Sequence, residues 1–163
     1  LLWFYAELFD SRVLFMTLEG GMGLLVNWGE EANFVISVGG FHPRYTPPPL
    51  PFPDIPRLAI TILNTEFARI RVEAYFAVTS NSVQFGAKAD LYFGFSVISV
   101  EGYFSFDALF QFNPFFFILE ISAALAIKVF GFGIWSISLS ASLEGPTPWH
   151  IQGKAKFLSL IHI

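Results

Sequence analysis

His42 and Arg44 are the residues of this 163-residue chain whose types and spacing come nearest to a binding site. They lie in the segment Gly39-Gly40-Phe41-His42-Pro43-Arg44-Tyr45, ahead of a proline-rich stretch. An imidazole and a guanidinium so close in the chain would make a polar patch for a ligand or a partner. The flanking glycines and proline favour a second interpretation, in which His42 is a turn residue that bonds backbone groups. We favour the turn for His42, and likewise for His150, which follows Gly145-Pro146-Thr147-Pro148.

No catalytic motif accompanies these histidines. The sequence contains no GxSxG elbow, no HExxH pair and no GxxxxGK[ST] phosphate loop. Gly20-Gly21-Met22-Gly23 lacks the lysine and the following helix of a phosphate site, so it predicts a tight turn. There is no cysteine, and a zinc site would need carboxylates from distant strands. We therefore predict no catalytic, cofactor-binding or metal-binding residue and a protein that is not an enzyme; an enzyme would need residues outside this segment.

Charged residues recur at alternate positions of neighbouring runs, on the side opposite the apolar residues. They are Arg71, Glu73, Lys88, Asp90 and Glu101. Carboxylates can act as general acids and bases, but lysine and arginine are interleaved with these. Opposite charges across strands stabilise a sheet by roughly 0.2–1 kcal/mol per pair. The pattern favours structural ion pairs on a solvated face.

The composition excludes some partners. The chain is 54% hydrophobic and 13% charged, with 21 Phe and a mean hydropathy of +0.58, whereas soluble domains average about 25% charged residues. A net charge of −4 with scattered basic residues gives no surface for nucleic acid. The longest uncharged stretch, Val129 to Leu143, is shorter than the roughly 20 apolar residues of a transmembrane helix, so none is expected.

Alternation of apolar and polar residues with a period of two dominates the chain and predicts strands. Two consecutive runs flank the turn residues Thr79-Ser80-Asn81-Ser82 and predict a long hairpin. Their apolar positions are Ile70, Val72, Ala74, Phe76 and Val78, then Val83, Phe85, Ala87, Ala89, Leu91 and Phe93. Further strands are predicted at Val97–Phe106, Phe115–Lys128, Trp135–Glu144 and Trp149–Phe157.

The N-terminal part predicts shorter strands, Arg12–Leu18, Met22–Trp28 and Asn33–Gly39, joined at Glu19-Gly20-Gly21 and Gly29-Glu30-Glu31. Six prolines between Pro47 and Pro56 predict an extended connection over the surface or a crossover between two sheets. The expected fold is all-β, an antiparallel meander of long strands in a sandwich or an open curved sheet. We divide it into an N-terminal β-meander (1–40), a proline-rich connection (41–56) and a long-stranded sheet (57–157).

The last six residues, Leu158 to Ile163, are what CTG TCT CTT ATA CAC ATC encodes. That string matches a transposase end sequence used in sequencing adapters. We interpret residues 158–163 as an adapter artefact and give them no role in the fold. Together with the missing initial methionine, this predicts a fragment of a longer protein.

Four segments together carry a resemblance to a known family: Val38–Arg44 before the proline run, Thr79–Ala87, Gly102–Phe112 and Leu143–His150. They resemble a bacterial family of very large β-rich proteins, known as a domain of unknown function, over Ala32 to Phe157. The resemblance implies that this chain is a piece of a long protein. It carries over no activity and no site residue.

Three functions remain open. The first is a structural or interaction segment, whose apolar sheet face packs on another sheet or on the rest of its own large chain. The second is a carrier of lipid or another apolar ligand, with a lining formed by Phe115, Phe117, Leu119, Phe130 and Phe132. The third is a segment of an outer-membrane β-barrel, which the strands that are apolar on both faces disfavour. We predict no nucleic-acid partner.

Overall fold

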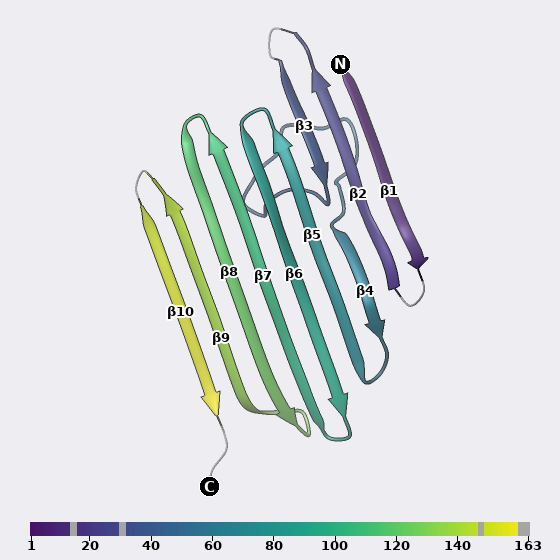
Figure 1. Ribbon diagram of the computed structural model, residues 1–163, viewed down its shortest axis with the longest axis vertical. Coiled ribbons are helices and arrows are strands. Elements are labelled where there is room, and N and C mark those ends of the chain that lie inside the picture. The colour runs from purple at the N-terminus through teal and green to yellow at the C-terminus, as the bar shows by residue number, and fades with distance from the viewer. Residues whose placement is uncertain (14–15, 30–31, 147–148, 160–163) are drawn as a thin grey trace.

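The chain folds into one antiparallel β-sheet. The structure is a computed structural model that describes residues 1–13, 16–29, 32–146 and 149–159. Figure 1 shows a single layer of long strands, with β1 and β10 at its two opposite edges. The strands are β1 Leu2–Val13, β2 Met16–Asn27, β3 Asn33–Val38, β4 Leu58–Asn64, β5 Ala68–Thr79, β6 Ser82–Phe95, β7 Ile98–Phe112, β8 Phe115–Val129, β9 Phe132–Gly145 and β10 His150–Ser159. The predicted all-β antiparallel fold is confirmed, and the described residues form one sheet and not a sandwich.

Strands β5 to β10 follow one another as an up-and-down meander. The predicted hairpin of β5 and β6 is confirmed, with Val78 opposite Val83 and Thr79 opposite Ser82. Asn81 lies in the turn between β5 and β6, and its side chain binds the turn between β7 and β8 at the same end of the sheet. Asn81 Nδ2 donates to the Asn113 carbonyl at 2.8 Å, and Asn113 N donates to Asn81 Oδ1 at 2.9 Å. The side-chain amide of Asn81 thus holds the β7–β8 turn against the β5–β6 turn.

Two short strands share the position between β2 and β5. β3 pairs with the Met22–Asn27 part of β2 and the Phe76–Thr79 part of β5. β4 pairs with the other halves of the same two strands, below β3 in Figure 1. The chain therefore leaves the sheet after β3 and re-enters the same row at β4.

Two predictions for the N-terminal part are wrong. Glu19-Gly20-Gly21 is not a turn, because β2 runs through it unbroken. The glycines make room for a close approach of the chain, since a Cβ on Gly21 would lie 2.7 Å from Pro56 Cδ. The segment Arg12–Leu18 is not one strand either; it divides between β1 and β2, and Val13 pairs with Met16. The predicted connections at 29–31 and 145–148 lie partly outside the described residues.

The two faces of the sheet differ sharply in polarity. Cross-strand partners point to the same side, and neighbours along a strand point to opposite sides. We call the side with Val72, Phe85 and Phe104 the apolar face and the side with Glu73, Lys88 and Ser105 the polar face. The described residues contain no helix with the length and hydropathy needed to cross a membrane.

Candidate functional site

Residues 39–57, which we call the strap, connect β3 to β4 by crossing the sheet (Figure 1). The strap starts at two glycines with positive φ, +82° at Gly39 and +95° at Gly40. It is fastened at its other end by Arg57, whose guanidinium donates to the carbonyl of Gly39 at 3.0 Å and to that of Phe41 at 2.6 Å. Prolines supply the rest of the strap with fixed φ angles and no donors to satisfy, so an irregular segment can lie on a sheet.

A small hydrophobic core lies beneath the strap. Phe52 packs with Leu25 and Val35, and the exposed fractions of the three are 8%, 6% and 2%. The Phe52 ring also lies 5.7 Å from the ring of Tyr5 and 6.0 Å from that of Trp3. This core attaches the strap to β1, β2 and β3.

His42, a residue of the strap, is buried against β6, with an exposed fraction of 1%. Its backbone N–H donates to Gln84 Oε1 at 3.0 Å, and its Nδ1 accepts the backbone N–H of Arg44 at 3.0 Å. The interpretation of His42 as a turn residue that bonds backbone is therefore confirmed. Its Nε2 is buried without a hydrogen-bond partner among the described residues. Burial lowers the pKa of His42, so the imidazole is neutral at physiological pH.

Arg44 points the other way, along the surface of the polar face. Its guanidinium donates to Glu120 of β8 at 3.0 Å and also to Glu144 of β9. These bonds raise the pKa of Arg44 and lower that of Glu144. The structure therefore separates the two residues of the predicted polar patch. His42 is buried, whereas Arg44 lies on the surface and holds the strap against β8 and β9.

Arg57 of the strap forms a polar group with Asp107 and with Tyr75, which is 5% exposed. The Tyr75 hydroxyl donates to Asp107 Oδ1 at 2.7 Å, and the Arg57 guanidinium lies 3.9 Å from the centre of the Tyr75 ring. A Cβ on Gly86, the cross-strand partner of Tyr75, would lie 2.6 Å from the ring. The glycine thus lets the phenol lie flat on β6 and reach β7.

This environment predicts a loss of stability at alkaline pH that depends on Tyr75. Burial and the hydrogen bond to Asp107 raise the pKa of Tyr75 above that of a free phenol, about 10. A raised pKa stabilises the folded state below pH ~10, and this contribution disappears as the pH rises further. Tyr75→Phe is expected to cost about 1 kcal/mol at pH 7 and to flatten the decline of unfolding free energy above pH ~10. Urea unfolding of both proteins between neutral and alkaline pH measures the two slopes; equal slopes would contradict the assignment.

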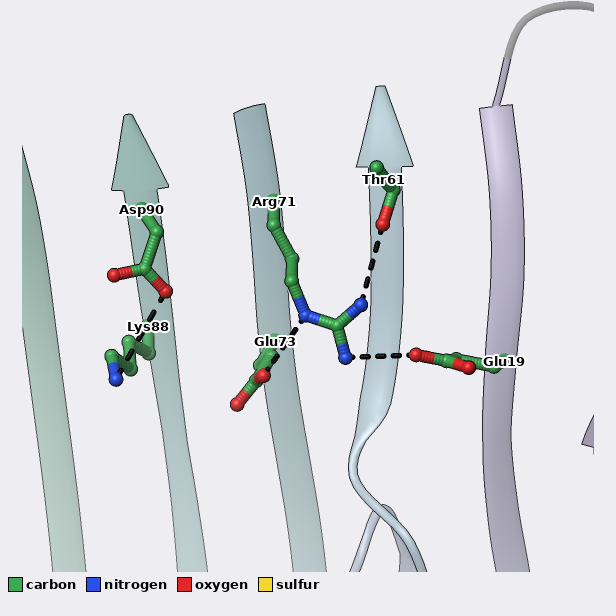
Figure 2. Close-up of polar contacts among 6 residues, drawn as sticks. All are labelled: Glu19, Thr61, Arg71, Glu73, Lys88 and Asp90. Carbon is green, nitrogen blue, oxygen red and sulfur yellow. Dashed lines mark hydrogen bonds and ion pairs between the residues drawn. The ribbon is translucent and has the colours of Figure 1, made fainter. Parts of the chain in front are cut away.

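The charged residues predicted to pair on one face do form ion pairs, but those within the predicted set run along one strand, and the partners across strands are Glu19 and Lys128. Figure 2 shows Arg71 between three partners from different strands. It lies 2.8 Å from Glu19 of β2, 3.1 Å from Glu73 of its own strand and 3.3 Å from the Thr61 hydroxyl of β4. Lys88 lies 4.0 Å from Asp90, and Lys128 lies 3.1 Å from Glu101. Partial exposure limits each pair to about 1 kcal/mol or less, so these pairs fix register and solubility more than stability.

Beside the strap, the polar face is hollowed over β7 to β10. The hollow has a volume of about 580 Å³ and is lined by Arg44, Ser105, Glu120, Ser140, Ser142 and Lys154, among others. No group of three or more possible metal ligands occurs in the described part of the chain. The hollow offers hydroxyl and carboxylate oxygens to a polar ligand, and it holds no pairing of a nucleophile with a base.

The residues predicted to line an apolar site lie in two places. Phe115, Phe117 and Leu119 point to the apolar face at the start of β8, where Phe117 packs 6.2 Å from Phe110 and 5.4 Å from Trp149. Phe130 and Phe132 lie at the opposite end of β8, with exposed fractions of 72% and 75%. A strand rises about 3.3 Å per residue, so roughly 40 Å separates Phe117 from Phe132. One small ligand cannot contact both groups.

No motif in the sequence distinguishes Tyr75, Gln84, Asp107 or Glu144. Each lies on the polar side of a strand by the period-two pattern, and that position was the available signal. The pattern does not reveal the path of the strap, and it is the contacts along this path that distinguish these four residues from many others on the same face.

Comparison with known proteins shows a family but adds no activity. A search of curated proteins and a search of solved structures each found no match. The model of a family described as a family of unknown function (DUF6603) matches residues 1–163. The chain therefore belongs to the family of unknown function DUF6603.

Proposed function

We propose that this chain is a non-enzymatic structural or interaction segment whose apolar face is covered by a second β-sheet of protein. One observation carries the proposal: an entire face of the sheet is apolar and uncovered by the described residues. On it, Phe76 is 48% exposed, Phe104 45% and Leu139 52%. Apolar residues continue on this side from β2 to β10.

Such a face needs a cover. Contiguous apolar patches on soluble proteins rarely exceed a few hundred Å² unless they contact a partner. The strap does not cover the apolar face, because its contacts with Gln84, Tyr75 and Glu120 lie on the polar face. The small core under the strap is likewise on that side. The apolar residues of β5 to β9 therefore pack only against neighbours on the same face, and no described segment covers them.

The shape of the face favours a sheet as the cover. Two sheets pack face to face about 10 Å apart with interdigitating side chains, and this needs an extended surface without a deep pocket. The resemblance to very large β-rich proteins supports a sheet from the rest of the same long chain as that cover. Sites for small ligands are instead concave and enclose most of the ligand.

One observation favours a second candidate, the carriage of lipid or another apolar ligand. A hollow of about 330 Å³ lies on the apolar face and is lined by Phe106, Leu119, Ile121, Leu143 and Ile151, among others. Leu119 belongs to the predicted apolar lining. An acyl chain lying across β7 to β10 would fill this hollow without reaching Phe130 or Phe132.

Labelling of introduced thiols distinguishes these functions. The chain has no cysteine, so Phe104→Cys reports on the apolar face and Tyr103→Cys on the polar face. These neighbours are 45% and 40% exposed, which makes them a matched pair. In the intact natural protein, with any cysteine outside this segment replaced and purified without detergent, we expect Phe104→Cys to react at least about tenfold more slowly than Tyr103→Cys, because labelling of a covered thiol requires local opening.

Native mass spectrometry with lipid extraction completes the experiment. Protection of Phe104→Cys in a lipid-free protein supports the covering sheet. Protection that disappears when co-purifying lipid is extracted supports the carrier. Equal labelling of both thiols contradicts both proposals, since the apolar face would then be open to water.

A further inference from the structure

We propose that the polar face over β6 to β9 is a binding surface for a neutral oligosaccharide, with Tyr103 at its centre. This inference concerns the face opposite to the one used in the proposed function and does not depend on it. It combines two adjoining hollows, an uncovered aromatic ring and a set of hydroxyl groups that make no bonds to protein.

The two hollows meet at Tyr103. The first has a volume of about 510 Å³ and is lined by Arg71, Tyr92, Glu101, Tyr103, Ala124 and Ala126, among others. The second, of about 580 Å³, includes Ser122 in its lining. The hydroxyls of Tyr103 and Ser122 are 3.1 Å apart, so the two hollows adjoin at this hydrogen-bonded pair.

Tyr103 presents a ring that a sugar can cover. Its cross-strand partner is Ala124, and Ala126 lies opposite Glu101 in the next position along the same strands. These methyl groups are too short to cover the ring, which remains 40% exposed. Tyr92, by contrast, has the Arg69 guanidinium over its ring at 4.6 Å. A rigid amphipathic ring with an open face and a polar edge suits the C–H face of a pyranose.

The second hollow supplies the hydrogen-bonding groups. Cross-strand register aligns Ser105, Ser122 and Ser140 in one row. Asp107, Glu120 and Ser142 form the next row. Within the described residues, the hydroxyls of Ser105, Ser140 and Ser142 have no protein partner within hydrogen-bond distance. A hydroxyl donates and accepts and a carboxylate accepts, and a sugar ring displays matching hydroxyls.

The charges of the lining favour a neutral ligand. The Arg44 guanidinium is already bound by Glu120 and Glu144, and Arg71 by Glu19 and Glu73. The two linings together hold four cations, Lys154 among them, and five carboxylates, so an anionic ligand would compete for the two arginines and meet an excess of like charge. A neutral oligosaccharide binds without disturbing them.

Calorimetric titration of the full chain with defined hexasaccharides tests the inference. The probes are cellohexaose, maltohexaose, laminarihexaose, xylohexaose and mannohexaose, each up to about 10 mM, a range that covers millimolar dissociation constants. At least one is expected to bind. Tyr103→Ala should weaken that binding about tenfold, the effect of losing one stacking contact.

Phe104→Ala is the matched control. It removes a similarly exposed aromatic ring from the next position of β7, on the opposite face, and should change the affinity less than about twofold. Equal loss in the two variants would overturn the proposal, because binding would then follow the apolar face. Absence of binding by all five neutral probes would also overturn it, as would binding by an anionic hexagalacturonate alone.

Discussion

Replacing Phe52 with alanine is expected to lower the free energy of unfolding by about 3 kcal/mol. Phe52 is the one large aromatic residue of the strap that is fully inserted between strap and sheet, with 8% of its surface exposed. Its ring lies directly over the backbone of β2, where a Cβ on Gly23 would be 2.8 Å away. Removal of the ring leaves a cavity that rigid strands on one side cannot fill, so the cost exceeds that of transfer alone.

Phe95→Ala is the matched control for this prediction. Phe95 is 82% exposed, so the same substitution should change stability by less than about 0.5 kcal/mol. Equilibrium unfolding in urea measures both variants. Trypsin cleavage after Arg44 and Arg57 adds a local readout, because detachment of the strap exposes both bonds. Equal stability and equal cleavage of the two variants would show that Phe52 does not hold the strap.

The meander of β5 to β9 was predictable because its two faces meet different surroundings. When one face is polar and the other apolar, a shift by one residue reverses every side chain, so the alternation defines both strand and register. Residues such as Val78 and Val83 therefore appear opposite each other as expected. The charged residues of the polar face follow from the same pattern, but their cross-strand partners Glu19 and Lys128 do not.

The failures concern contacts between residues distant in the sequence. Gly20 and Gly21 have the composition of a turn, yet they lie in a strand because Pro56 and Leu58 approach the backbone there. Nothing near residue 20 in the sequence indicates that approach. The bond between His42 and Gln84 joins residues 42 positions apart, and only the path of the strap creates it. The predicted lining lies in two places because its two groups of residues are at opposite ends of β8, a separation that the length of the predicted strand already implies.

Gly39 is the second position where a large effect is expected. It has φ = +82°, and a Cβ there would lie 2.4 Å from the carbonyl oxygen of Ala74 and 3.0 Å from the backbone nitrogen of Leu58. Both obstacles are backbone atoms of paired strands, which cannot rotate away as a side chain would. Gly39→Ala is therefore expected to cost about 3 kcal/mol or more, the sum of left-handed backbone strain and displacement of the sheet.

Gly131→Ala separates these two costs. Gly131 has nearly the same conformation, φ = +80°, but a Cβ there would meet nothing within 4 Å. It should lose only the backbone term, about 1–2 kcal/mol. Urea unfolding of both variants gives the difference, which measures how closely the strap's first residue is held against β4 and β5. If the two substitutions cost the same, that contact would be loose, and the strap would leave the sheet elsewhere than at Gly39. If Gly39→Ala alone also exposes Arg44 and Arg57 to trypsin, the close approach at Gly39 is what directs the strap across the polar face.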